Sequence, residues 1–293
     1  MTTKKFSSAH IEQLLEALKD LGSGAAEIVR RHSSQPAEDS QANREQASYV
    51  VPRAATLAWG TANILIEFGA AHVSGFVRLA EEPMNIEASF TCVRSMLEAC
   101  AIAAWLTDPS IEAHERAGRT YAHRYEGFVQ QLKFGEASKQ PKKTMDTLHA
   151  RIDAVEQEAI GAGFKKLLDK KGKRCGIGRH MPSATDIIEN VLRDGMTYRL
   201  LSGVAHGHPS SLTKLVYQIV DDRLPEEATM VLLEKIAHPT TIAFLGFKIF
   251  SALSRALWNQ AHFCGWDVLK LEEVFEDVAD KADYPIRWRF WRS

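Results

Sequence analysis

The sequence predicts an all-α fold, a multi-helix bundle with long antiparallel helices, and three observations lead to that prediction. Apolar residues recur with helical periodicity along most of the chain. No pair of segments alternates apolar and polar residues as two neighbouring strands would. Short polar stretches, several of them containing Pro or Gly, separate apolar runs that are long enough to be bundle helices.

The expected helices follow from this periodicity and from the signals that begin or end each one. Residues 213–221 fit either a helix or an isolated extended segment. The Asp-Pro-Ser stretch at 108–110 is typical of a point where one helix stops and another starts. Ser183 or Thr185 is suited to cap the N-terminus of a helix over 184–207. We expect helices over about 8–31, 50–80, 87–106, 110–134, 143–170, 184–207, 227–237, 240–264 and 267–280.

Length and composition are those of a globular protein with a sizeable core. The chain has 293 residues, of which 45% are hydrophobic and 25% are charged. The formal net charge of −1 excludes a general attraction to nucleic acid or anionic membranes, so any such preference must come from local patches. We expect three parts: an N-terminal helix and linker at 1–48, a bundle core at 49–265, and a C-terminal helix with a basic, aromatic tail at 266–293.

The apolar spans and the N-terminus favour a cytoplasmic protein without a membrane partner. Residues 1–18 contain no long apolar stretch and do not resemble a secretory signal. The most apolar spans, 54–80 and 240–264, are interrupted by polar or charged residues, among them Lys248 and Arg255. A charge near the centre of a bilayer costs roughly 2.5–3.5 kcal/mol, so both spans are interpreted as buried helices of a soluble protein.

Motifs for metals and cofactors are missing from the sequence, so we expect neither. The four cysteines form no Cys-x-x-Cys pair, and Cys92 and Cys100 lie in an apolar run typical of a core. No Glu-x-x-His pair supports a di-iron bundle. No phosphate-binding Gly-x4-Gly-Lys loop supports a nucleotide site. His206 and His208 have no Asp or Glu within six residues to complete a local metal site.

Polar residues on otherwise apolar helices are the strongest functional signal. On a helix over 184–207, Tyr198, Arg199, Ser202 and His206 fall within about 100° of one another and continue the apolar arc of its first half. We therefore expect Arg199 and His206 to be neighbours enclosed by other helices. A polar arc in that position needs partners or water.

Two other helices carry candidate supporting residues. Arg94 and Glu98 interrupt an apolar helix and share one face, which fits either a structural ion pair or a polar cavity. Arg119 and His123 lie on the polar side of the 110–134 helix. That side is either solvated or, if it turns inward, part of the same site.

The chain has one strongly basic segment and one basic, aromatic tail. Residues 165–180 carry seven Lys or Arg against one Asp, and Lys171, Lys173 and Arg174 are candidates for phosphate binding. A solvated loop is the alternative. The tail at 284–293 interleaves Arg with Trp and Phe, so it suits stacking on bases, lying on a membrane surface, docking on a partner or folding back on its own protein.

Arg199 and His206, with six residues between them on one predicted helix, resemble the Arg-x4–6-His motif of the HEPN superfamily. The sequence Tyr-Arg-x-x-Ser-x-x-x-His-Gly at 198–207, the RSMLEA stretch at 94–99 and the Pro-Ser-x-Thr helix start at 182–185 are also similar to uncharacterised bacterial helical proteins placed near HEPN. As architecture, the resemblance covers about residues 50–260. Two features depart from active members: Leu200 replaces the usual polar residue, and the spacing is at its upper limit.

This resemblance implies a metal-independent endoribonuclease of a stress or phage-defence system, acting on RNA in the cleft of a homodimer. In it, the RNA 2′-hydroxyl attacks its own phosphate, His206 is the general acid or base, and Arg199 holds the phosphate. Imidazoles titrate near neutral pH, which suits that role.

Two alternatives remain open from the residues themselves. The first is a non-catalytic scaffold or interaction protein in which Arg94, Glu98, Tyr198, Ser202 and His206 form a buried polar network. The second is a helical protein that binds a small molecule in a cavity lined by these residues.

Overall fold

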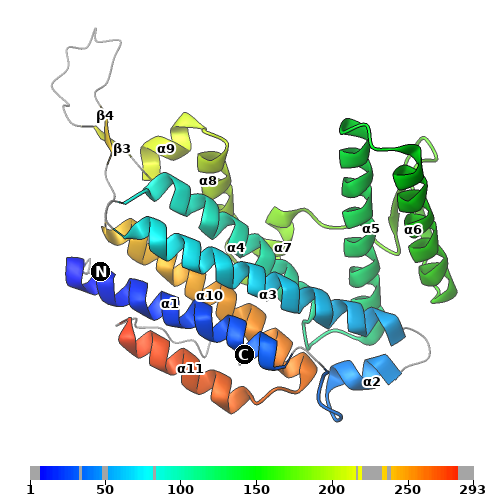
Figure 1. Ribbon diagram of the computed structural model, residues 1–293, viewed down its shortest axis with the longest axis horizontal. Coiled ribbons are helices and arrows are strands. Elements are labelled where there is room, and N and C mark those ends of the chain that lie inside the picture. The colour runs from blue at the N-terminus through cyan, green and yellow to red at the C-terminus, as the bar shows by residue number, and fades with distance from the viewer. Residues whose placement is uncertain are drawn as a thin grey trace, which may run out of the picture.

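The computed structural model describes residues 7–32, 35–47, 52–81, 84–215, 217–219, 233–235 and 239–282. Within these ranges the chain is an all-α helical bundle with two short hairpins, as the helical periodicity predicts (Figure 1). The basic, aromatic tail at 284–293 lies outside the described residues, so its four interpretations stay predictions.

Long helices packed side by side form the main bundle (Figure 1). They are α1 (Ser8–Arg31), α3 (Pro52–Ala80), α4 (Ile86–Leu106), α10 (Pro239–Cys264) and α11 (Val268–Lys281). Fully buried aromatic rings from three of them, including Phe76, Phe90 and Phe250, meet in one core. Leu14, Leu18 and Leu21 of α1 belong to the same core, so the N-terminal helix packs as part of the bundle.

A second, smaller core lies beside the bundle. The short helix α2 (Gln41–Ala47) leads into α3, and after α4 the chain turns into α5 (Ala113–Ala137), which stands away from the bundle and pairs with α6 (Lys142–Gly161) (Figure 1). Tyr121 and Tyr125 of α5 pack against Ile152 and Val155 of α6.

The basic segment that follows α6 forms a hairpin, which the periodicity did not predict. Strand β1 (Lys166–Leu168) pairs antiparallel with β2 (Arg174–Ile177). Strands of three and four residues are too short for alternation to be recognised in the sequence. The predicted helix over 143–170 therefore ends nine residues early, at Gly161.

The predicted helix over 184–207 is two helices. Ser183 caps α7 (Ala184–Leu192) by accepting a hydrogen bond from the backbone N–H of Asp186. Arg193 then adopts a left-handed conformation with φ of 57°, and α8 (Gly195–Ala205) begins after Asp194. This break changes the direction of the chain, so residues on either side do not share one helical wheel.

A short helix and a second hairpin complete the described chain. Helix α9 (Pro209–Leu215) precedes β3 (Tyr217–Ile219), which pairs antiparallel with β4 (Leu233–Lys235). Of residues 213–221, the described ones end α9 and form β3, and this extended segment is paired with β4, not isolated as the sequence suggested. The predicted helix over 227–237 is wrong at 233–235, where the chain is a strand, and its other residues lie outside the described ranges.

Among the described residues, two helices are long and apolar enough to cross a membrane by length and composition, namely α4 and α10. In the most apolar window of each, 67% and 61% of the residues are buried inside the protein. Core helices of soluble proteins pass the same test, so this finding assigns no compartment.

Candidate functional site

Tyr198 on α8 is held by two charged residues of α4, against which α8 packs. Arg94 donates from Nη2 to the Tyr198 Oη across 3.2 Å, and the tyrosine hydroxyl donates to Glu98 Oε2 across 3.0 Å. The Arg94 guanidinium also lies 5.2 Å from the centre of the tyrosine ring. We call these three residues the Tyr198 clamp. Three of the five residues predicted to form a polar network are therefore brought together.

The clamp fixes the ionisation state of its tyrosine. Burial and the neighbouring Glu98 carboxylate raise the pKa of Tyr198, and Arg94 opposes them only in part. The phenol therefore stays protonated at neutral pH and serves as the donor to Glu98. In the described part of the chain, Arg94 Nε is buried without a hydrogen-bond partner, so the guanidinium is held by one of its edges only.

The outer side of α8 carries Arg199 and His206, and both side chains are exposed. The expectation that other helices enclose them is wrong. Tyr198, Leu201 and Val204 take the buried side of α8, and Arg199, at about 100° from Tyr198, points outward. The helical wheel predicted correctly how the side chains of α8 point relative to one another. The inward direction, however, was inferred from the apolar residues of 184–192, and these belong to a separate helix because the chain breaks at Arg193.

Helix α8 ends in a tight turn that places two histidines side by side. His206 is the C-cap residue, and Gly207 follows with φ of 69°, a left-handed conformation that glycine adopts without strain. The backbone N–H of Gly207 donates to Val204 O across 2.9 Å, and that of His208 donates to Gly203 O across 2.8 Å. This is a Schellman motif. The imidazole centres of His206 and His208 are 6.1 Å apart.

Helices α8 and α9 approach each other very closely at this turn. A Cβ on Gly203 would lie 2.1 Å from Ser211 Oγ on α9, so only glycine fits there. His208, which the sequence analysis considered only as a metal ligand, is brought close to His206 by this turn. Ser202, the remaining member of the predicted network, is half-buried, and none of the hydrogen bonds between described residues uses its hydroxyl.

A second ionic contact ties the start of α8 to α10, and sequence reasoning missed it. Asp194 accepts hydrogen bonds from Thr197 Oγ1 across 2.6 Å and from Lys248 Nζ across 2.9 Å. In the sequence, Lys248 stood out only as a charge within an apolar run. Helix α8 is thus held at its start by Lys248 and near its middle by the Tyr198 clamp.

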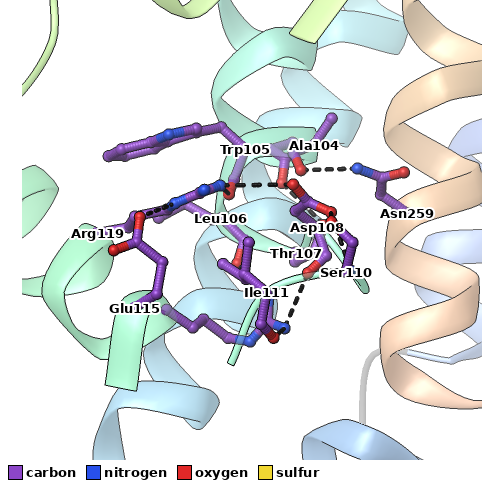
Figure 2. A network of polar contacts seen from close by, with 12 residues as sticks. Ala104, Trp105, Leu106, Thr107, Asp108, Ser110, Ile111, Glu115, Arg119 and Asn259 are labelled. Carbon is purple, nitrogen blue, oxygen red and sulfur yellow. Dashed lines mark hydrogen bonds and ion pairs between the residues drawn. The ribbon is translucent and has the colours of Figure 1, made fainter. Parts of the chain in front are cut away.

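Arg119 and His123 do not join this site, because α5 stands away from α8 (Figure 1). Arg119 instead helps to cap the C-terminal end of α4 (Figure 2). It donates to the carbonyl of Trp105 across 2.7 Å and to Glu115 across 2.8 Å, and it lies 3.7 Å from Asp108. Asn259 of α10 caps the neighbouring carbonyl, that of Ala104, across 2.8 Å (Figure 2). These bonds satisfy carbonyls that have no partner within the helix.

The basic hairpin is partly neutralised by its own carboxylates. Arg174 pairs with Asp153 and Glu156 of α6. The backbone N–H groups of Lys171 and Lys173 each donate to Asp169 Oδ1 across 2.8 Å, so that carboxylate already fills the turn where a phosphate was expected. The side chains of Lys171 and Lys173 are exposed.

Among the described residues, neither a metal site nor one of the three cavities lies at the Tyr198 clamp or the histidine turn. Among the described residues, no group of three or more His, Cys, Asp or Glu side chains is placed to hold a metal ion. Cavities of about 740, 400 and 320 Å³ lie elsewhere, and none of the three is lined by Arg94 or His206.

Fold and site together define an all-α bundle protein with a braced helix that presents arginine and histidine to solvent. Residues 71–223, just over half of the chain, match the family of unknown function DUF5677. The chain therefore belongs to that family, and the matched region contains both the Tyr198 clamp and the histidine turn. No curated protein and no solved structure matches the chain.

Proposed function

We propose that this protein is a HEPN-like, metal-independent endoribonuclease that acts in the cytoplasm as part of a stress or phage-defence system. The observation that carries the proposal is the two-sided construction of α8. Tyr198 is clamped on the inner side, while Arg199 and His206 are exposed on the outer side of the same helix and its cap.

The chemistry follows from the side chains on that outer side. His206, the C-cap residue, lies seven positions after Arg199, so on helical geometry their Cα atoms are about 10 Å apart along the axis and project about 20° apart. A long arginine side chain spans much of that distance. Arg199 binds a backbone phosphate and stabilises charge in the transition state, and His206 removes the proton from the attacking 2′-hydroxyl. As the 2′-oxygen bonds to phosphorus, the bond from phosphorus to the 5′-oxygen breaks; this leaves a 2′,3′-cyclic phosphate and a 5′-hydroxyl, whose proton comes from water.

A second copy of the chain completes the site in this proposal. Both residues lie on an open surface, and a single α8 supplies no opposite wall to hold RNA. Met196, three residues before Arg199, is 84% exposed, and an apolar side chain in that position suits contact with another subunit. A homodimer that pairs two α8 helices places two Arg/His sets around one cleft.

A non-catalytic scaffold or interaction protein is the second candidate, and the Tyr198 clamp is the observation that favours it. A polar bridge between α4 and α8 fixes the register of the two helices without any chemistry. Leu200, where active HEPN members usually carry a polar residue, also favours this candidate.

Cleavage of a labelled single-stranded RNA in the presence of EDTA tests the proposal. We expect His206→Ala and Arg199→Ala each to reduce the rate at least about a hundredfold, the usual contribution of a general acid or base. His149→Ala and Arg151→Ala, at exposed positions on α6, are the matched controls and should keep the wild-type rate. If wild-type protein is inactive, or if the α8 and control variants behave alike, the scaffold is the better description.

A further inference from the structure

A cavity of about 320 Å³ lies between α3, α4 and α5, well separated from the histidine turn of α8. Leu57 and Thr61, one turn apart, line it from α3, and Leu106 lines it from the end of α4. Helix α5 contributes one continuous face with the spacing i, i+3, i+4, i+7, i+8 and i+11. These residues are Thr120, His123, Arg124, Gly127, Phe128 and Gln131.

One wall of this cavity carries the positive charge of Arg124, whose guanidinium lies 5.7 Å from the centre of the Phe128 ring. In the described part of the chain, Nη1 of Arg124 is buried and makes no hydrogen bond. The nearby Glu158 carboxylate is engaged with Arg53, across 3.3 Å, and with the Tyr121 hydroxyl, also across 3.3 Å. Burial lowers the pKa of Arg124, and the positive charge of Arg53 lowers it further. A buried N–H donor of this kind, on a side chain that is otherwise half-buried, is costly unless an acceptor reaches it.

The remaining lining combines hydrogen-bonding groups with apolar surface. Thr61, Thr120 and Gln131 bring polar groups to the cavity wall. Burial lowers the pKa of His123, so its imidazole is neutral at neutral pH and adds no second charge. None of the described lining residues is Asp or Glu. Leu57, Leu106 and Phe128 add apolar surface to the lining.

We propose that this cavity is a binding site for a small carboxylate with an apolar body, such as an aromatic acid. The carboxylate accepts hydrogen bonds from the Arg124 guanidinium, and the apolar body packs against Leu57, Leu106 and Phe128. A volume of about 320 Å³ is at the lower end of the range for ligand sites, which limits the ligand to roughly one ring and its acid group. The site is independent of the ribonuclease proposal.

Gly127 gives a way to close the cavity without disturbing the protein. It lines the cavity, and a Cβ built on it meets nothing within 4 Å. A leucine there therefore extends into open space, and replacing a glycine inside a helix also favours the helix. Gly127→Leu should fill the cavity while the fold is preserved.

The test is a ligand-observed fluorine NMR titration of the full chain with 4-fluorobenzoate and with its neutral analogue 4-fluorobenzamide. We expect 4-fluorobenzoate to bind with a dissociation constant below about 1 mM, and at least about tenfold more tightly than the amide. Arg124→Gln should abolish that preference, and Gly127→Leu should abolish binding of both compounds. Arg151→Gln, an exposed arginine on α6, should leave binding unchanged.

Circular dichroism and thermal unfolding establish that each variant is folded before it is titrated. Three results overturn the proposal: no binding of 4-fluorobenzoate by wild-type protein up to about 5 mM; equal affinity for the acid and the amide; or binding of the acid that survives both Arg124→Gln and Gly127→Leu.

Discussion

Replacing Arg116 with methionine tests how the end of α4 is held. Arg116 is fully buried, and its Nε donates to Glu45 Oε2 across 2.9 Å. Its other nitrogens donate to the carbonyls of Leu106, Asp108 and Ile111 across 2.8, 2.9 and 3.3 Å. The guanidinium also lies 3.9 Å from the centre of the Phe263 ring.

The cost of this change follows from the groups left behind. Methionine preserves most of the apolar stem, so the loss of packing is small. The Glu45 carboxylate, whose side chain is only 9% exposed, loses its ion-pair partner and keeps the hydrogen bond from Gln41 Nε2 across 2.9 Å. The buried Leu106 carbonyl loses the hydrogen bond from Arg116. Removing one member of a buried ion pair costs about 3–5 kcal/mol, and we expect Arg116→Met to lower the free energy of unfolding by about 4 kcal/mol.

Urea denaturation followed by far-UV circular dichroism measures this free energy. Arg151→Met, at an exposed position on α6, is the control and should change it by less than about 0.5 kcal/mol. Adding Glu45→Met to Arg116→Met should recover at least about 1 kcal/mol, because it removes the stranded carboxylate. A loss below about 1 kcal/mol in the single variant, with an unchanged denaturant slope, would refute the reasoning.

Three further predictions concern local features. Tyr198→Phe should lower the free energy of unfolding in urea by about 1–2 kcal/mol, because two half-buried hydrogen bonds to charged groups are lost; an unchanged midpoint would contradict the clamp. Gly207→Ala should cost about 1–2 kcal/mol in the same assay, since its φ of 69° disfavours any residue with a Cβ; equal stability would mean that the turn relaxes freely. Burial opposes ionisation of Glu115, but Arg119 and Arg179 outweigh it and hold the pKa of that carboxyl below its usual 4.5. Its contribution to stability is therefore present above pH 4.5 and is lost as the pH falls through the lowered value. The difference in free energy of unfolding between wild type and Glu115→Gln, measured in urea, should become smaller as the pH falls over that range. A difference that does not change with pH would contradict a stabilising role for the ionised Glu115 carboxylate.

The helices were predictable because their apolar periodicity is long and regular. Helix α1 begins and ends at the predicted residues, and α4 and α10 do so within one residue. The contact of Tyr198 with Arg94 and Glu98 was also predictable, because polar side chains within apolar helices must find partners. The sequence did not reveal that Tyr198 lies between the two charges.

The exposure of Arg199 and His206 was not predictable, because the expectation that they are enclosed assumed a continuous helix from 184 to 207. The break between α7 and α8 is marked by the positive φ of one residue, Arg193. Arginine rarely adopts a left-handed conformation, so the residue type does not predict this break. Without that continuity, the apolar positions of α7 say nothing about the side on which α8 is buried.

Contacts between distant segments were the other part that the sequence could not supply. Arg116 is paired with Glu45, and Lys248 with Asp194, across 71 and 54 residues of chain. Helical periodicity fixes which residues share a face, but it does not say which helix that face meets. The cavity beside Arg124 depends in the same way on how α5 crosses α3.

Metal-free cleavage of single-stranded RNA by wild-type protein and by His206→Ala tests the functional account most directly. The account predicts cleavage in EDTA by the wild type, and loss of that cleavage in a variant whose unfolding curve is unchanged, since His206 is exposed at the end of its helix. Equal cleavage by both proteins, or none by the wild type, would contradict it.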